Sequence, residues 1–473
     1  MNSNNTNPRD KEKQLLGADP FIGLTERLAQ FAQRYQSHFK SLTRNVAQVA
    51  GHYLKGLFQS HKKNMERMEE MAPEADEQRL QHFLSESPWD EQAVMEQVAK
   101  GADTILGGKA DSSLIVDESA FTKKGTHSVG VARQYNGRMG KVDNCQVGVF
   151  SALSSGTQVC PVGTRLFLPV KWTRNRKRCR KAGVPQQRFK HQTKQELALE
   201  LVKQARQQGL RFKWVQGDGA YGHDLKFCRN LDDLGERFLL DVHKNKRIYL
   251  EYPAVAVSEK GSKSAATSQR LRTKVKATTA QKWAKRQPKS AWQPLKLRDS
   301  TKGEIIVEVV HRRVWVWDGK TQRVDQWWLL AQRDQAGDYK YTLSNAAQTV
   351  DWKELAIQSA QRYWIERCFE DGKGKVGMGD CQARGWVSWH HHMAMVMMAM
   401  LFLLEERQYN QSAMPLISCT DVVELLCCAL PSRKVDGQEL LRQIKLRHEK
   451  RQASIDAAYA KQRAQKMSSS GGT

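Results

Sequence analysis

The spacing of hydrophobic residues changes along the chain and separates helical from strand-forming regions. Near the start, Phe21, Leu24, Leu28 and Phe31 recur every three or four residues. This is the period of a helix that packs on one face. We therefore predict a set of short helices over residues 21–108.

From residue 111 onward, short apolar runs replace the helical pattern, and two of them end in an aspartate. Residues 113–116 precede Asp117, and residues 212–217 precede Asp218. Both runs are typical of buried strands, and ligands bind at the carboxyl edge of the strands in α/β sheets. One such aspartate is ordinary, because aspartate often begins a turn. Two of them favour a functional site at this edge.

The region between residues 244 and 344 combines a basic segment with further strands. Residues 260–302 are poor in apolar side chains and rich in Lys and Arg, which predicts a flexible basic loop or arm. The stretches 304–317, 323–333 and 339–343 then alternate like strands, with Asp-Gly and Gly-Asp turns between them.

A second helical region follows, and one of its helices carries an unusual row of charges. Arg362, Glu366 and Lys373 fall on one stripe of a helix. An ordinary interpretation is an amphipathic helix with a solvated face. The alternative is that the carboxylate binds a metal ion while the two cations bind phosphates. Cys368, close to Glu366, is interpreted as a packing residue.

Composition narrows the possible partners. The chain has 76 Lys and Arg against 50 Asp and Glu, a net charge of +26, which favours a polyanion, either nucleic acid or an anionic membrane surface. The apolar run over residues 393–404 is far below the roughly 18 residues of a spanning helix. The N-terminus has no signal-peptide pattern, so we expect the protein to stay in the cytoplasm. The nine cysteines include no Cys-x-x-Cys pair, which favours reduced, buried thiols.

Taken together, three motifs resemble those of the DDE transposases of bacterial insertion sequences. They are the strand that ends in Asp117, the Gly-Asp-Gly-Ala-Tyr-Gly turn around Asp218, and the helix with Arg362 four residues before Glu366 and Lys373 seven after it. The resemblance covers residues 53–407 and is to the branch with this glutamate motif. Ser359 stands where that branch often has a tyrosine, which is a departure from the pattern.

The resemblance implies an α/β fold that has an RNase H-like catalytic core with an all-β insertion and an N-terminal helical domain. We expect six segments: a disordered tail (1–20), a helical DNA-binding domain (21–108), the first part of the core (109–243), a basic loop and β-strand insertion domain (244–344), the second part of the core (345–410) and a C-terminal helical region (411–473).

The same resemblance implies the chemistry. Asp117, Asp218 and Glu366 would bind two Mg²⁺ ions, or Mn²⁺ in their place, roughly 3.5 to 4 Å apart. The ions would activate water to nick DNA at the element's ends and then a 3′-hydroxyl to attack the target, in a cut-and-paste reaction. Arg362 and Lys373 would hold phosphates. Glu370, four residues after Glu366, is the alternative third carboxylate. The expected partners are double-stranded DNA, at the element ends and the target, and a second copy of the chain on that DNA; we expect no membrane. The resemblance also implies a protein of the bacterial cytoplasm, associated with the nucleoid.

Further DNA contacts are predicted in three places, each with an ordinary alternative. Cations on the predicted N-terminal helices could bind the terminal DNA of a mobile element, or these helices could simply pack on the catalytic core. The cations are Lys55, Lys62, Lys63 and Arg67. A dense basic run offers Arg174, Arg176, Lys177 and Arg178 to phosphates, or it is only solvated. In the resembling transposases the insertion supports base flipping and a hairpin intermediate, in which an aromatic side chain stacks on the extruded base. The candidates for this role are Trp315, Trp317, Trp327 and Trp328. The alternative is that these tryptophans pack in the core.

The histidine run at residues 390–392 invites a metal site, but consecutive helical positions point in three directions. We therefore expect His392 to be a hydrogen-bonded residue near the DNA backbone. Two other functions remain open from the sequence: an RNase H-like nuclease without strand transfer, and a non-catalytic DNA-binding protein derived from a transposase.

Overall fold

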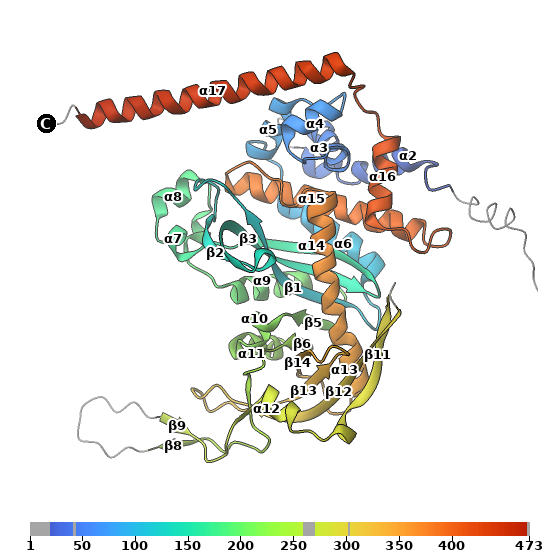
Figure 1. Cartoon of the computed structure of the whole chain (residues 1–473), viewed down its shortest axis with the longest axis vertical. Helices are drawn as coiled ribbons and strands as arrows, with labels where there is room; N and C mark the ends of the chain where they lie inside the picture. Colours follow the sequence, from blue (N-terminus) through green and yellow to red (C-terminus); the bar gives the residue numbers. More distant parts are fainter. Residues whose placement is uncertain (1–18, 41–43, 259–269, 301–302, 471–473) are drawn as a thin grey trace, which may run out of the picture.

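A ten-stranded mixed sheet forms the centre of the protein (Figure 1). The computed structural model describes residues 19–40, 44–258, 270–300 and 303–470. The strands lie in the order β11-β12-β13-β14-β6-β5-β1-β3-β2, with β4 paired to β3. Their bounds are β1 Ser113–Thr122, β2 Ala132–Asn136, β3 Lys141–Ser155, β4 Gln158–Leu166, β5 Trp214–Gly217, β6 Phe238–Asp241, β11 Gln293–Ser300, β12 Gly303–Val316, β13 Asp325–Arg333 and β14 Tyr339–Ser344.

The middle of the sheet is parallel and its two sides are antiparallel. β1 pairs parallel with β5, and β5 pairs parallel with β6. On one side β3 runs antiparallel to β1, and on the other β14 runs antiparallel to β6. The mixed α/β character expected from the sequence is confirmed. The strands expected in the insertion domain, β11 to β14, are hydrogen-bonded into the same sheet as the parallel strands.

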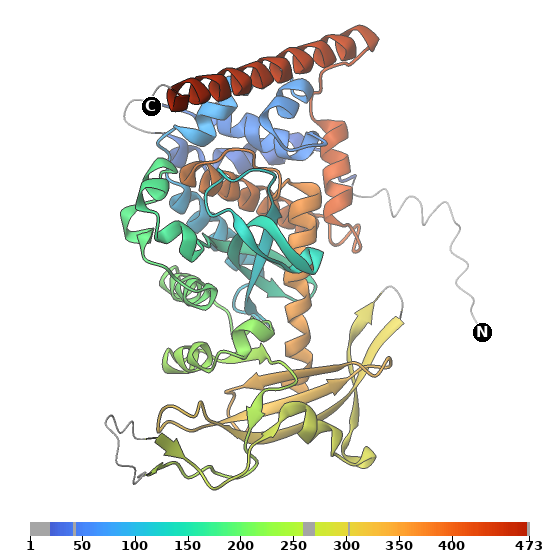
Figure 2. The same cartoon turned by 60° about the vertical axis from the view of Figure 1, so that its left-hand side comes forward.

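The helices lie mainly around one half of this sheet, and α14 starts near the β-rich half and runs past the parallel strands toward the helical half (Figures 1 and 2). The helix bounds are α2 Leu24–Gln33, α3 Ala47–Gln59, α4 Met65–Met71, α5 Glu77–Ser85, α6 Glu91–Leu106, α7 Val170–Thr173, α8 Arg176–Lys181, α9 Lys194–Gln207, α10 Gly219–Gly222, α11 Leu225–Asp233, α12 Ala280–Lys285, α13 Trp352–Ser359, α14 Tyr363–Lys375, α15 Trp386–Tyr409, α16 Cys419–Ala429 and α17 Gly437–Ser470.

Helix α15 is the central element of the helical half. It is long and apolar enough to cross a bilayer by composition, but 94% of its most apolar stretch is buried inside the protein. Helices α3, α5, α6 and α16 pack against it, and α6 also contacts β4. The N-terminal helices therefore share one hydrophobic core with α15 and the sheet.

The segment predicted to be a flexible basic loop is largely regular where it is described. Residues 259–269 and 301–302 lie outside the described residues, as does most of the predicted disordered tail (1–20). Between them, residues 270–300 form β9 (Arg270–Arg272), β10 (Thr278–Thr279), α12 and β11. The loop prediction is wrong there because Trp283 and Trp292 are buried, and two large aromatic side chains anchor a segment that has few other apolar residues.

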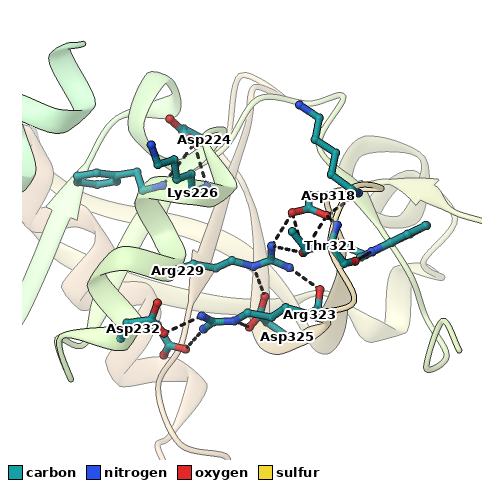
Figure 3. A network of polar contacts seen from close by, with 12 residues as sticks. Asp224, Lys226, Arg229, Asp232, Asp318, Thr321, Arg323 and Asp325 are labelled. Carbon is teal, nitrogen blue, oxygen red and sulfur yellow. Dashed lines mark hydrogen bonds and ion pairs between the residues drawn. The ribbon is translucent and has the colours of Figure 1, made fainter. Parts of the chain in front are cut away.

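A buried ion-pair network fastens α11 to the loop before β13 (Figure 3). The guanidinium of Arg229 donates to Asp325 at 2.7 Å, to Asp318 at 2.6 Å and to the carbonyl oxygen of Arg323 at 2.5 Å. Arg323 in turn pairs with Asp232 at 3.0 Å. Because every charge has a partner, this network is a structural junction between the parallel strands and the β-rich half.

Candidate active site

The register of the parallel strands places Asp117 and Asp218 side by side. The pairing of β1 with β5 ends at Val116 opposite Gly217, so each aspartate is the next residue on its strand. The sequence predicted that the first strand ends at Asp117. It continues instead to Thr122, because β3 pairs with β1 along its whole length. Asp117 therefore lies within a strand, at the point where its parallel partner ends.

Asp218 begins the short helix α10, and its side chain accepts a hydrogen bond from the Ala220 N–H at 2.9 Å. Steric contact explains why a glycine is needed at position 222 in this turn. A Cβ atom on Gly222 would lie 2.1 Å from the carbonyl oxygen of Asp241, so only glycine lets α10 approach β6 this closely. The turn thereby holds Asp218 against the ends of the strands.

A third strand-end aspartate, Asp241, was not predicted as a site residue. Gly217 pairs with Leu240, so Asp241 follows Asp117 and Asp218 in a row across β1, β5 and β6. The signal was present in the sequence, because the apolar run Phe238–Leu240 also ends in an aspartate.

Arg362 brings the carboxylates of distant segments together. It lies immediately before α14, and its guanidinium is 2.8 Å from Asp241, 3.0 Å from Glu366 and 3.8 Å from Asp117. Helix α14 is held in place because Ile365 and Cys368 are buried in the core. The side chains of Asp117, Asp241 and Glu366 are each more than a hundred residues apart in the sequence, and all three meet at the guanidinium of Arg362.

The electrostatics of the pair Asp117 and Asp218 favour a bound cation. Burial and the neighbouring charge of Asp218 raise the pKa of Asp117 from 3.8 to about 8. Burial and the charge of Glu118 also raise the pKa of Asp218. Burial works against the charged form of Arg362, but Asp241 and Asp117 raise the pKa of its guanidinium overall. Ionised carboxylates are therefore disfavoured at this site by burial and by mutual repulsion, and the positive charge of Arg362 offsets this only in part.

These residues fit a divalent ion in donor type. Carboxylate oxygens are hard ligands that suit Mg²⁺, and a cation between Asp117 and Asp218 would remove their mutual repulsion. As they stand, no three His, Cys, Asp or Glu side chains within the described ranges form a ligand set. Glu366, whose side chain is 55% exposed, pairs with Arg362 and would have to rotate toward the aspartates.

Two other acidic residues near the site are engaged elsewhere. Glu370, the alternative third carboxylate, pairs with Arg367 at 2.9 Å and is 70% exposed. Glu118 contacts Lys194 at 2.5 Å and accepts a hydrogen bond from the hydroxyl of Tyr221 at 3.2 Å. Neither contacts Arg362.

The predicted cations differ in what they contact. Lys373 lies two turns beyond Glu366 on α14, with its amine 5.5 Å from the centre of the Phe121 ring. Arg178 stacks on Trp172 at 3.6 Å and donates to the carbonyl oxygen of Thr126. The other cations of that basic run are exposed to solvent: Arg174, Arg176 and Lys177.

The four candidate tryptophans fall into two pairs. Trp327 and Trp328 are buried, and the indole N–H of Trp328 donates to the carbonyl oxygen of Ala347 at 3.2 Å. Trp315 and Trp317 are half-buried. Trp315 packs edge-to-face on Tyr252, and the indole N–H of Trp317 donates to the carbonyl oxygen of Thr321 at 2.6 Å, so the second pair differs from the first in being partly exposed.

His392 is hydrogen-bonded through both ring nitrogens, as expected from the sequence. Its side chain is fully buried, its Nε2 donates to the carbonyl oxygen of Gly377 at 2.9 Å, and its Nδ1 accepts from the hydroxyl of Tyr53 at 2.8 Å. Burial lowers the pKa of His392 to about 4. His390 and His391 are buried too, each bonded to backbone carbonyl oxygens. The run packs α15 against its neighbours, and the expected closeness of His392 to the DNA backbone stays a prediction.

Comparison with known proteins agrees with the geometry. Residues 37–304, more than half of the chain, match the family described as DDE superfamily endonuclease. The chain is also 33% identical over 177 residues to a protein described as a probable transposase for insertion sequence element IS701, from Microchaete diplosiphon. That alignment covers 36% of this chain and 41% of the relative's length. The family match ends before α14, so Arg362 and Glu366 are placed by the structure.

Proposed function

The chain belongs to the DDE superfamily of endonucleases, and on that premise we propose that it is the transposase of an insertion sequence. It would cleave DNA at the ends of a mobile element and join those ends to target DNA by a cut-and-paste route. The observation that carries the proposal is the meeting of Asp117, Asp241 and Glu366 at the guanidinium of Arg362, with Asp218 beside Asp117.

Endonucleases of this superfamily generally use divalent metal ions. Asp117, Asp218 and Glu366 would hold them here. Two bound Mg²⁺ ions, or Mn²⁺, would supply an activated oxygen nucleophile and stabilise the leaving oxygen. Asp117 and Asp218 are positioned by the strand register, and Glu366 would complete the set by turning away from Arg362.

The cations beside the carboxylates would bind the substrate. Once Glu366 and Asp117 face metal ions, the guanidinium of Arg362 keeps its bond to Asp241 and can direct its remaining N–H groups to a phosphate. Lys373 would bind a second phosphate further along α14. The net charge of +26 supports DNA as the partner, and joining two ends supports a dimer on the DNA.

The test uses the DNA that flanks the gene as the source of both element ends. Wild-type protein with paired end duplexes and Mg²⁺ should yield cleaved ends and strand-transfer products. The variant Glu366→Gln should lose at least a hundredfold in cleavage rate while it still binds the ends. Glu370→Gln is the matched control on the same helix and should remain active.

Three outcomes would change the proposal. Loss of cleavage in Glu370→Gln and not in Glu366→Gln would reassign the third carboxylate. Cleavage without strand-transfer products would favour a nuclease that does not integrate DNA. Binding without cleavage under any divalent ion would favour a non-catalytic DNA-binding protein.

A further inference from the structure

A basic pocket lies between three segments that are far apart in the sequence. Its walls come from the loop between α3 and α4, the turn after β1, and the loop between α14 and α15. Its volume is about 450 Å³. The charged side chains in its lining are Lys62, Lys123, Lys124, Arg384 and Asp380.

The charges of this pocket are unbalanced. Asp380 is the one carboxylate against four cations in the lining, and it already accepts a hydrogen bond from the backbone N–H of Lys63 at 3.0 Å. Lys62, Lys124 and Arg384 are exposed, and their side chains contact no hydrogen-bond or ion-pair partner in the part of the chain that the structure describes. A concave surface that gathers cations without counter-charges attracts an anion.

One wall of the pocket is anchored by a partly buried lysine. Lys123 is half-buried, and its amine donates to the carbonyl oxygen of Cys381 at 2.5 Å. This bond ties the end of β1 to the loop after α14. The wall of the pocket is therefore fixed to the same strand that carries Asp117.

Among the four cations predicted for DNA contact in the N-terminal helices, only Lys62 faces this pocket. Lys55 pairs with Glu74 at 4.0 Å, and Arg67 pairs with a neighbouring glutamate on its own helix at 2.5 Å. Lys63 is buried and donates to the carbonyl oxygen of Phe58 at 2.9 Å. The structure thus separates one cation that faces the pocket from three that contact partners elsewhere.

The pocket lies in line with the carboxylates. Strand β1 leads from Asp117 toward Lys123, and at about 3.3 Å per residue these six steps span about 20 Å. Lys373 lies between the two places, because it is about 10 Å along α14 from Glu366 and its amine is over Phe121 of β1. At about 3.4 Å per nucleotide along a DNA strand, 20 Å corresponds to about six nucleotides.

We propose that this pocket binds backbone phosphates of the substrate DNA, about six nucleotides from the cleaved bond. The inference rests on the proposed function, since it takes the carboxylates as the cleavage site. The pocket would then set the distance between the bound duplex and the reacting phosphate. Its contacts are to the backbone, so they position the DNA without reading its sequence.

The first measurement is the salt dependence of binding to an end duplex, with the full-length variant Lys62→Gln/Lys124→Gln/Arg384→Gln. Each phosphate contact contributes about 0.9 to the slope of log K against log salt concentration. We expect the slope to fall by up to about 2.7 in this variant. The control Lys109→Gln/Lys203→Gln/Arg237→Gln removes the same charge from exposed positions, two of them just before β1 and β6 and so at the opposite edge of the sheet. Its slope should match the wild type.

The second measurement maps the contact on the DNA. Single phosphates of the end duplex are replaced by uncharged methylphosphonates, counted from the terminal nucleotide of the element. Wild-type protein should lose affinity at positions about six nucleotides from the terminus, and the pocket variant should show no loss there. Equal slopes in the pocket and wild-type proteins, or a wild-type map without this position, would overturn the proposal.

The two proposals fail differently. Wild-type protein that shows the expected map but never cleaves with Mg²⁺ or Mn²⁺ would refute the transposase function and leave the pocket assigned. Wild-type protein that cleaves the ends but shows no sensitivity near position six would refute the pocket and leave the function intact.

Discussion

Binding of a divalent ion to the carboxylates should release a proton from Asp117. In the metal-free protein the pKa of Asp117 is raised to about 8 by burial and by the charge of Asp218. A group with that pKa is about 0.9 protonated at pH 7 and about 0.1 protonated at pH 9. Since only the ionised form binds a metal ion, we expect about 0.9 protons released per protein at pH 7 and almost none at pH 9.

Titration calorimetry with Mg²⁺ or Mn²⁺ measures this release, because the apparent enthalpy then depends on the ionisation enthalpy of the buffer. The affinity should rise about tenfold per pH unit from pH 6 to pH 7 and level off above pH 8. Asp117→Asn should bind the ions more weakly and with a smaller buffer and pH dependence, of which the remainder comes from Asp218, whose pKa is also raised; Glu370→Gln should preserve both dependences. An affinity that is constant from pH 6 to pH 9, with no buffer dependence, would refute the assignment of Asp117 as a ligand.

The same raised pKa affects the stability of the metal-free protein. A carboxyl group whose pKa is higher in the folded than in the unfolded state contributes stability below about pH 4, and that contribution is lost as the pH rises through about 8. Asp117→Asn cannot ionise, so we expect it to melt at a higher temperature than the wild type at pH 8, with a smaller difference at pH 5. The gain is at most about 5 kcal/mol, from four pKa units at about 1.36 kcal/mol each. A lower melting temperature for Asp117→Asn at pH 8 would contradict this account of its electrostatics.

Two further predictions concern the scaffold around the site. Arg229→Met should destabilise the protein by about 1 to 3 kcal/mol, because Asp318 loses its cation and the buried Asp325 keeps only Arg323, whereas Arg442→Met breaks a surface pair on α17 and should cost less than about 1 kcal/mol. Denaturation in urea distinguishes them, and equal effects would show that the junction in Figure 3 does not depend on Arg229. Gly222→Ala should lower both stability and cleavage, because its Cβ would meet the Asp241 carbonyl oxygen. Gly51→Ala, in a helix with open space around it, should instead raise stability by about 1 kcal/mol.

The sequence was sufficient to locate the strand-end aspartates, because the rule behind them is local. An apolar run followed by an aspartate can be read without knowledge of the fold, and it identified Asp117 and Asp218, whose strands the structure shows to be adjacent. The same rule applies to Asp241. That residue was missed because its importance depends on the register of β6 against β5 and on a bond to Arg362, 121 residues away.

Sequence patterns were insufficient where packing between distant segments decides the outcome. The partners of His392 could not be predicted, because helix α3 brings Tyr53 to it and buries both side chains. The segment around Trp283 has the composition of a loop, yet burial of its tryptophans gives it regular structure. In that segment a few apolar contacts outweigh the local pattern.

The distribution of charge explains how one protein can attract DNA and still place carboxylates at the centre of the site. The chain as a whole carries a net charge of +26, whereas the carboxylates of Asp117, Asp218, Asp241 and Glu366 surround a single arginine. A phosphate drawn in by the basic surface would therefore be repelled by the centre unless cations neutralise it. Cations in the site would remove that repulsion and free part of the guanidinium for the phosphate. Metal and DNA should consequently strengthen each other's binding, and this coupling is lost if the aspartates are neutralised by substitution.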